Sequence, residues 1–517
     1  MRAVGIDLGT SNSAVAVLDD DGRARILTTE EGSTTLPSIV AFDDGGKVLV
    51  GEAALARAAS HPHDALFGAK RLLGRRADEP EVRKLGRLLP YELVPAPNGD
   101  AWMRAADRSI SPEQVSAFVL RELKTMAERF LDEPVEDAVI TVPAWFDAGQ
   151  RQATKDAAAI AGLRVRRQLN EPTAAALGHG AHRGQNRRFA VCDLGGGTFD
   201  VAIVDVEDGV FEVLATAGDS FLGGDDVDRA IVEQLVREMR SKGGIDVGAE
   251  AAALVRLRAA AQHAKHDLSE SLVADVALPR LAQMPSGKPL DLVRPIRRDE
   301  LELWSTPILK RLEAPCREAL LRAGRAAGEV DEILLVGGMT RMPAVRRALA
   351  EIFGKEPQVI PNPDEVVAVG AAVEVARLEG RIEGVLLLDV TARGLSVTVG
   401  EDAPCELVIA PSSVIPTREH RVIATRTDNQ RELEFDLWEG EAPESSGNRH
   451  LARYAVRGLP RAPAGEVLVM VEITIDVDGT ARVAASEMIS GERPELRQIG
   501  GAGLSRSEVA RLAEASR

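Results

Sequence analysis

The sequence predicts a multidomain protein in which a mixed α/β region is followed by an all-β sandwich, and three observations support this fold class. The 517 residues exceed what one hydrophobic core organises, so the chain should divide into several domains. Up to about residue 379, apolar strands alternate with helices, as they do in α/β regions. From Val385 onward the chain shows strands and turns, with no convincing helix before its last residues.

The elements of the α/β region follow from their start and stop signals. Short apolar strands separated by Gly and Asp turns fill residues 1–110, and a helix begins after Ser111. Ser111 can cap this helix, Pro112 suits its first position and Gln114 completes a capping box. Further predicted elements are a strand over 137–146, a helix over 150–161, a helix over 249–268 and a strand over 332–343.

The character of the chain changes near Val385. The apolar strip VLLLDV spans 385–390, and the alternating runs behind it, such as LSVTV, ELEFDLW and VLVMVEITIDVDG, predict a separate β sandwich. At the end of the chain Ser505 and Glu508 form a capping box. A helix of about a dozen residues does not persist alone in water, so this one must dock or fray.

Composition limits the functions open to this chain. The net charge of −17, with no long basic run, argues against binding nucleic acid. Three cysteines without a CxxC motif argue against disulfides and structural zinc, which fits a reducing compartment, and Cys192 is expected to serve packing. The N-terminus is already strand by Val4, and no apolar run approaches the roughly 20 residues of a membrane span, so we expect a cytoplasmic protein.

The chain contains the same short motif twice, VGIDLGTSNSAVAV at 4–17 and AVCDLGGGTFDVAIV at 190–204. Each copy predicts a hairpin whose glycine-rich bend carries an acid and a hydroxyl. A single such bend is usually only a tight hairpin, but chance does not duplicate the acid, the glycine and the hydroxyl together. The duplication suggests two similar halves facing one another across a cleft, each offering N–H groups to a phosphate.

A nucleoside triphosphate fits these bends. Gly9–Ser11 and Gly195–Thr198 can donate N–H groups to phosphates, while Asp7, Asp193 and Asp200 can hold magnesium mainly through water. A third glycine turn, VGGMTR at 336–341, suits the adenosine, with Arg341 stacking on the purine. No GxxxxGK[ST] motif occurs, which excludes a P-loop enzyme. These parts predict an ATP-binding, actin-like fold and leave a sugar kinase, a filament protein and a chaperone open.

Longer strings decide among these three. IDLGTSNS, KRLLGRR, VITVPAWF, RQATKDAAAIAGL, NEPTAAAL, DLGGGTFD, LGGDDVD, LVGGMTRMP, NPDEVVAVGAA and VLLLDVT occur in order. Together they resemble the 70-kDa heat-shock chaperone family of the DnaK type, from Val4 to about Asp478, and most specifically in the first 390 residues. The resemblance implies a duplicated, ribonuclease-H-like ATPase domain over 1–383, an apolar linker over 384–390, a peptide-binding sandwich over 391–497 and a truncated lid helix over 498–517.

The resemblance also implies an activity, which is slow ATP hydrolysis that regulates the binding and release of unfolded polypeptide segments. Its cofactors would be ATP or ADP, Mg²⁺ and K⁺. Its partners would be extended polypeptides, a J-domain co-chaperone and a nucleotide exchange factor, with neither nucleic acid nor a membrane. A role in protein folding and the stress response goes with this activity.

Site residues carry over onto matching positions of this sequence. The implied catalytic residues are Lys70, Glu171, Asp193 and Thr198, and the implied metal contacts are Asp7, Asp193 and Asp200. The implied nucleotide contacts are Gly9, Thr10, Ser11, Asn12, Gly195, Gly196, Gly197, Thr198, Gly223, Gln262, Lys265, Ser269, Gly337, Gly338, Arg341 and Asp364. The implied switch and linker residues are Pro143, Arg151, Leu387, Leu388 and Asp389. Asp389 and Arg167 sit where the family contacts J-domain proteins.

The first part of the chain departs from the family pattern at two places. Gln262 replaces the glutamate that binds the ribose hydroxyls, which predicts weaker or altered nucleotide affinity. Residues 145–148 replace a tyrosine-containing string near the co-chaperone surface.

The sandwich departs further. Residues 400–402 and Arg426 stand where the family arches a methionine and an alanine over the peptide. Leu433, Phe435 and Arg426 are the predicted peptide-groove residues, with ordinary sandwich core as the alternative for the first two. The chain stops at Arg517, which predicts a member without the helical lid, from which bound peptide exchanges quickly.

Three functions therefore compete. The first is an ATP-regulated, lidless chaperone for extended apolar peptide, and the second is an ATP-switched interaction module with one dedicated protein partner. The third, a small-molecule kinase of the same superfamily, gains little support because a kinase needs no β sandwich of about a hundred residues behind an apolar linker.

Overall fold

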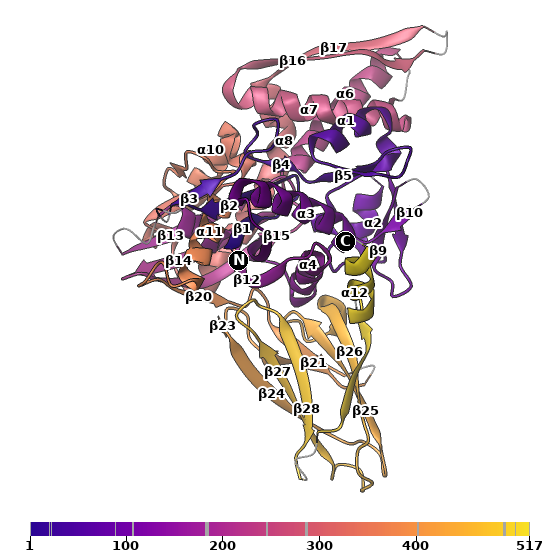
Figure 1. Cartoon of the computed structure of the whole chain (residues 1–517), viewed down its shortest axis with the longest axis vertical. Helices are drawn as coiled ribbons and strands as arrows, with labels where there is room; N and C mark the ends of the chain where they lie inside the picture. The colour runs from indigo at the N-terminus through magenta and orange to yellow at the C-terminus, as the bar shows by residue number, and fades with distance from the viewer. Residues whose placement is uncertain are drawn as a thin grey trace.

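A computed structural model describes residues 2–19, 21, 23–87, 89–105, 108–180, 186–243, 247–284, 288–400, 403–489, 493–501 and 503–515. Figure 1 shows the α/β region in the upper part of the molecule and the sandwich below it. The fold class predicted from the sequence is confirmed, because mixed sheets with helices precede a part built from antiparallel strands. No helix in the described ranges has the length and apolarity needed to cross a membrane.

Two sheets with equivalent strand orders form the centre of the α/β region. The first runs β12-β11-β1-β2-β3, with β4 beside β2, and the second runs β19-β18-β13-β14-β15-β20-β23. The strands of the first sheet are β1 (Arg2–Asp7), β2 (Asn12–Leu18), β3 (Ala24–Ile26), β4 (Leu36–Pro37), β11 (Val135–Val142) and β12 (Arg164–Asn170). Those of the second are β13 (Arg187–Leu194), β14 (Phe199–Glu207), β15 (Val210–Asp219), β18 (Glu332–Val336), β19 (Gln358–Val359), β20 (Leu386–Val390) and β23 (Val414–Ile415).

Smaller sheets and the helices surround this centre. The smaller sheets contain β5 (Ile39–Phe42), β6 (Val48–Val50) and β7 (Ala65–Phe67), then β8 (Glu92–Pro95), β9 (Ala101–Ala105) and β10 (Arg108–Ile110), and the hairpin of β16 (Val273–Gln283) and β17 (Pro289–Arg297). The helices are α1 (Glu52–Ser60), α2 (Pro80–Gly86), α3 (Pro112–Leu131), α4 (Ala148–Ile160), α5 (Glu171–Gly178), α6 (Gly224–Gly243), α7 (Ala251–Glu270), α8 (Arg298–Leu309), α9 (Glu313–Arg322), α10 (Pro343–Phe353), α11 (Val366–Leu378) and α12 (Arg506–Ala515).

Helix starts follow the capping signals. The capping box predicted for α3 is confirmed, since Oγ of Ser111 accepts from N of Gln114 and Oε1 of Gln114 accepts from N of Ser111, both at 3.2 Å. Helix α4 begins two residues before its predicted start, because Asp147 and Gln150 form a second capping box. The strand predicted over 332–343 ends at Val336, where Gly337 adopts a φ of +80° and a short 3₁₀ helix follows.

The sandwich packs a five-stranded sheet on a three-stranded sheet. The five strands are β21 (Leu395–Thr398), β22 (Glu406–Ile409), β25 (Glu432–Glu439), β26 (Arg449–Arg457) and β29 (Glu495–Gly501), and the three are β24 (Thr417–Ala424), β27 (Leu468–Ile475) and β28 (Ala481–Glu487).

The last helix docks rather than frays. Val509 and Leu512 of α12 pack with Leu504 against the core of the first half, next to α4 (Figure 1). The predicted capping box is confirmed, because N of Ser505 donates to Glu508 at 2.8 Å and N of Glu508 donates to Ser505 at 3.3 Å. Residues 498–501, placed in a helix by the sequence, belong to β29.

Candidate functional site

The two copies of the duplicated motif form equivalent hairpins in the two halves. β1 pairs with β2 and β13 with β14 in antiparallel register, and a parallel strand flanks each first strand, β11 beside β1 and β18 beside β13. The two turns face each other, since a Cβ on Gly196 would lie 2.0 Å from Oγ of Ser11, and one on Gly197 2.5 Å from Cγ2 of Thr10. A side chain at either position would therefore have to displace Ser11 or Thr10 of the first turn.

Five side chains form what we call the acidic cluster, and they come from elements far apart in the sequence. They are Asp7 on β1, Lys70 on a 3₁₀ turn, Glu171 at the start of α5, Asp193 on β13 and Asp200 on β14. All except the partly buried Asp7 are buried. Nζ of Lys70 donates to Oε1 of Glu171 at 2.5 Å. Oγ1 of Thr141 donates to Asp7 at 2.8 Å, and the main-chain N–H of Trp145 donates to Asp200 at 3.0 Å.

Charge in the acidic cluster is unbalanced. Removal from water and then the charge of Glu171 raise the pKa of Asp7 and of Asp200 from 3.8 to about 7, and the same causes raise the pKa of Asp193 well above 3.8. Burial acts to lower the pKa of Lys70, but Glu171 and Asp7 outweigh it and raise that pKa. Four carboxylates around one lysine fit a cation, because added positive charge would offset their repulsion.

A cleft of about 1900 Å³ separates the two halves and gathers many of the predicted nucleotide contacts. The acidic cluster is not part of its lining. The predicted contacts that line it are Thr10, Ser11, Asn12, Gln262, Ser269, Gly338, Arg341 and Asp364. A cleft of this size exceeds what a nucleotide alone would fill.

The predicted adenosine end lies on η7 (Gly338–Arg341) and on α7. Arg341 pairs with Asp364 at 2.6 Å, and Gly337 lies so close to Asp193 that a Cβ there would be 2.7 Å from Oδ1 of Asp193. On α7, the buried Nζ of Lys265 lies 2.8 Å from Oδ1 of Asp228, and Oγ of Ser269 donates to the main-chain oxygen of Lys265 at 3.2 Å. The third glycine turn therefore lies against Asp193 of the acidic cluster, and its adenosine role stays a prediction.

The remaining predicted glycine contacts hold the turns themselves. N of Gly9 donates to Oγ of Ser13 at 3.1 Å, and N of Gly195 donates to the main-chain oxygen of Thr198 at 3.2 Å. Gly223 lies against the main chain of Gly196, which a Cβ would approach to 2.5 Å.

A chain of hydrogen bonds links the acidic cluster to the sandwich through Arg151. This buried guanidinium donates to Oδ1 of Asn170 at 2.7 Å and to the main-chain oxygen of Asp478 at 3.1 Å. Asn170 immediately precedes Glu171 and also donates to Asp389 at 2.9 Å. Pro143 is buried two residues before Trp145, whose N–H holds Asp200. The predicted switch residues are thus brought together beside the predicted catalytic carboxylate.

The predicted linker is an ordered strand. In β20, Leu387 and Leu388 pair in parallel with Phe211 and Glu212 of β15, and Asp389 pairs with Ile415 of β23. β20 therefore lies within the sheet of the second half and pairs there with β23, a strand from the residues predicted as the sandwich.

The predicted groove residues lie in the sandwich. Leu433 and Phe435 are 2% and 1% exposed in its core, and Phe435 stacks on Tyr454 with ring centroids 5.3 Å apart. Arg426 is exposed, next to Gly400. Glu401 and Asp402 lie outside the described residues. The burial of the first two matches the ordinary-core alternative, and their groove role stays a prediction.

Sequence reasoning missed Thr141, Trp145 and Arg71 as parts of the site. Arg71 follows Lys70 directly, and the motif KRLLGRR was the available signal. Thr141 contacts Asp7 through its hydroxyl, and Trp145 contacts Asp200 through its main-chain N–H. Neither contact can be inferred from the composition of the chain.

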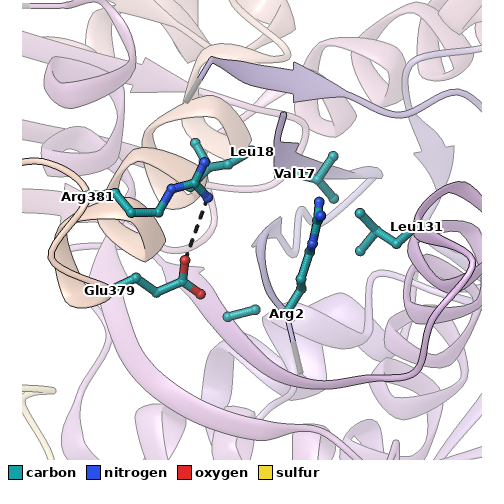
Figure 2. A pocket seen from close by; sticks show the side chains of 7 residues that line it. Arg2, Val17, Leu18, Leu131, Glu379 and Arg381 are labelled. Carbon is teal, nitrogen blue, oxygen red and sulfur yellow. Dashed lines mark ion pairs between the residues drawn. The ribbon is translucent and has the colours of Figure 1, made fainter. Parts of the chain in front are cut away.

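A second, smaller pocket of about 310 Å³ lies away from the cleft. Figure 2 shows the side chains that line it, with Arg381 and Glu379 forming an ion pair at 3.7 Å. Arg2 pairs with Glu133 at 2.9 Å and extends along the same pocket.

The family of the chain follows from a comparison with known proteins. A family model described as Hsp70 protein matches residues 3–517, which covers the duplicated hairpins, the cleft and the sandwich. The chain therefore belongs to the Hsp70 family, and this membership implies an ATP-dependent, chaperone-like function.

Proposed function

We propose that this chain hydrolyses ATP slowly at the acidic cluster and uses that hydrolysis to switch the sandwich between holding and releasing unfolded polypeptide. The observation that carries the proposal is the hydrogen-bonded path from Asn170, next to Glu171, through Arg151 to Asp478 on the sandwich. Such a path supports coupling, because a displacement of the sandwich acts on the segment that holds the carboxylate.

In this proposal each member of the acidic cluster has a role. Glu171 orients the attacking water and Lys70 offsets charge that grows on the γ-phosphate. Asp193 and Thr198 are the two further catalytic residues of this proposal. The facing glycine turns donate N–H groups to the phosphates.

Magnesium fits this donor set. Asp7, Asp193 and Asp200 would hold the ion mainly through water, because magnesium gives up its hydration water reluctantly. Bound there, magnesium supplies charge neutralisation for the phosphates.

We propose that the domain limits are those given by the resemblance. We also propose the partners that it implies, including a J-domain protein that contacts Arg167 and Asp389. Both side chains already have partners. Arg167 lies 2.8 Å from Glu374, and Asp389 accepts from Asn170 and from Thr173 at 2.9 and 3.1 Å. A J-domain protein that used them would have to displace these contacts.

Single-turnover ATPase measurements with and without extended apolar peptides test hydrolysis and coupling together. We expect measurable hydrolysis, stimulation by peptide and faster release of a fluorescent peptide when ATP is added. Tight ATP binding without any change in the peptide release rate would contradict the proposal.

A second candidate, an ATP-switched module with one dedicated partner, is favoured by the burial of Leu433 and Phe435 in the sandwich core. A peptide array separates the two candidates. Broad selection of apolar peptides supports the chaperone, whereas an empty array with one protein captured supports the dedicated module.

A further inference from the structure

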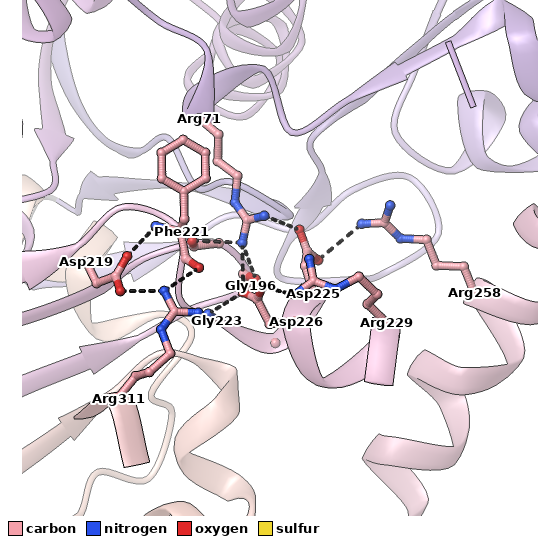
Figure 3. A network of polar contacts seen from close by, with 12 residues as sticks. Arg71, Gly196, Asp219, Phe221, Gly223, Asp225, Asp226, Arg229, Arg258 and Arg311 are labelled. Carbon is pink, nitrogen blue, oxygen red and sulfur yellow. Dashed lines mark hydrogen bonds and ion pairs between the residues drawn. The ribbon is translucent and has the colours of Figure 1, made fainter. Parts of the chain in front are cut away.

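Arg71 crosses from the first half of the α/β region to the second. It lies on η2 (Ala69–Arg71), directly after Lys70, and its side chain is 5% exposed. Figure 3 shows its guanidinium reaching the second glycine turn. Nη2 donates to the main-chain oxygen of Gly197 at 2.8 Å and to that of Gly196 at 3.4 Å.

Two carboxylates of the second half hold this guanidinium in place. Nη2 of Arg71 lies 3.5 Å from Asp226, and Nη1 lies 3.8 Å from Asp225, both in the first turn of α6. Asp226 also accepts from N of Gly223 at 3.0 Å. Asp225 is shared with Arg258 at 3.4 Å (Figure 3). The two halves are therefore connected by charge-assisted contacts at the turn itself.

The contact with the carbonyls has a geometric consequence for the turn. In a planar trans peptide the C=O and the N–H point in opposite directions. When Arg71 holds the oxygens of Gly196 and Gly197, the N–H groups of Gly197 and Thr198 are directed to the other side of the turn. The guanidinium thus sets the orientation of the Thr198 N–H through Gly197 and supports that of the Gly197 N–H, because the oxygen of Gly196 also accepts from N of Asp225 at 2.8 Å. The proposed function assigns both N–H groups to phosphates.

The same guanidinium retains an unused donor. Nε of Arg71 is buried and has no hydrogen-bond partner among the residues that the structure describes. It lies beside Gly197, where a Cβ would be 2.6 Å from it and 2.9 Å from Oγ1 of Thr10. A buried donor without a partner is unusual, and this one is next to the place where the two glycine turns meet.

We propose that Arg71 is a positioning residue that clamps the second glycine turn across the cleft, orients its N–H groups and slows the release of nucleotide. This inference rests on the proposed ATPase function. Arginine suits the task because its planar fork reaches two carbonyls and two carboxylates at once, which the single ammonium of lysine does not.

The test compares Arg71→Ala, Arg71→Lys and Asp226→Asn with the wild-type chain. Two rates are measured, the dissociation of a fluorescent ADP analogue by stopped flow and single-turnover hydrolysis at saturating ATP. We expect Arg71→Ala to speed dissociation and slow hydrolysis, each by about tenfold, as losing charge-assisted hydrogen bonds predicts. Both rates of Arg71→Lys should fall between those of Arg71→Ala and wild type. A double variant, Arg71→Ala with Asp226→Asn, should have the same two rates as Arg71→Ala, because the contact between the two residues is already lost. Arg76→Ala is the control, because Arg76 pairs with the exposed Asp78 within the same segment.

Addition of guanidinium chloride, against matched NaCl, should restore hydrolysis in Arg71→Ala, which a general loss of structure would not allow. Should Arg71→Ala fail to fold, Arg71→Lys and Asp226→Asn still test the clamp. Wild-type rates in these variants, with an active wild-type chain, would overturn the clamp alone. A wild-type chain that binds no nucleotide would overturn the proposed function, and the clamp with it.

Discussion

Lys70 and Glu171 form a buried ion pair, and their surroundings determine what each substitution will do. The pair is 2.5 Å apart, and three aspartates lie around it. Removal of Lys70 leaves four carboxylates without their lysine, whereas removal of Glu171 leaves Lys70 facing the three aspartates. Both residues lie outside the lining of the cleft, whereas the predicted nucleotide contacts Gln262, Ser269 and Arg341 belong to it, so replacing either one leaves these three residues in place.

Lys70→Ala and Glu171→Ala should therefore leave nucleotide binding largely intact and lower single-turnover hydrolysis by about 10²-fold or more. Glu171→Gln removes the charge but keeps the size of the side chain, and it should lower the rate of single-turnover hydrolysis as much as Glu171→Ala does. The exposed Lys310 provides the control variant, Lys310→Ala. Unchanged single-turnover rates in both site variants would refute the assignment.

Neighbouring glycines of the second turn should respond very differently to a methyl group. A Cβ on Gly196 would lie 2.0 Å from Oγ of Ser11, whereas one on Gly195 would meet nothing within 4 Å. Gly196→Ala should lower the free energy of unfolding by about 1–3 kcal/mol, as overpacking does, and Gly195→Ala should change it little. Urea unfolding curves of both variants measure this. Equal destabilisation would show that the turns do not meet as described.

Among the elements, the turn between β27 and β28 holds the sandwich to α4 and β12. Oδ1 of Asp478 accepts from N of Gln168 at 2.9 Å, and its carboxylate pairs with Lys155 at 2.7 Å. Asp478→Ala should keep basal hydrolysis and weaken its stimulation by peptide, because the side-chain contacts with Gln168 and Lys155 are lost while the main-chain oxygen that Arg151 contacts remains. Single-turnover rates with and without peptide report this, and Glu444→Ala, at an exposed position of the sandwich, is the control. Stimulation at the wild-type level in Asp478→Ala would show that these side-chain contacts do not carry the coupling.

Helix α3 carries a pH-sensitive group at its start. Burial raises the pKa of Glu113 from 4.5 to about 7, and Asp100 and Asp156 add to the shift while Ser111 opposes it. The folded state therefore binds more protons than the unfolded state between about pH 4.5 and 7, and the free energy of unfolding falls as pH rises through that window.

Glu113→Gln should remove this dependence. The variant should melt at a higher temperature than wild type at pH 8, and the difference should shrink toward pH 5. Thermal midpoints across this range measure the effect, with the exposed Glu81→Gln as the control. Parallel curves for wild type and Glu113→Gln would contradict it.

For the whole molecule, a nucleotide that contacts both halves should stabilise the folded state against thermal unfolding. A ligand at 100 times its Kd stabilises the folded state by about 2.7 kcal/mol. MgATP should therefore raise the thermal midpoint of the wild-type chain and of Glu171→Ala alike, and raise that of Gly196→Ala much less. Differential scanning calorimetry measures all three, and an unshifted wild-type midpoint would contradict nucleotide binding.

Much of the fold could be predicted because its signals are local. The box of Ser111 and Gln114 marked α3, and alternation marked the sandwich strands. Local signals also explain the errors. The helix predicted from residue 150 starts at Ala148 since the cap at Asp147 was overlooked, and residues 498–501 add a strand that depends on a neighbour, β26.

By itself, the sequence determined the two-part architecture and the duplicated hairpins with their three aspartates, because apolar periodicity, caps and motifs are local features of the chain, and Lys70 and Glu171 were predicted from the family resemblance. Only the tertiary structure decided which turns meet, that β20 pairs with β15 and β23 and that Arg71 spans the cleft. The separation along the chain explains why. Gly197 lies 126 residues from Arg71, and a contact over that distance depends on how both sheets pack, which no local pattern encodes.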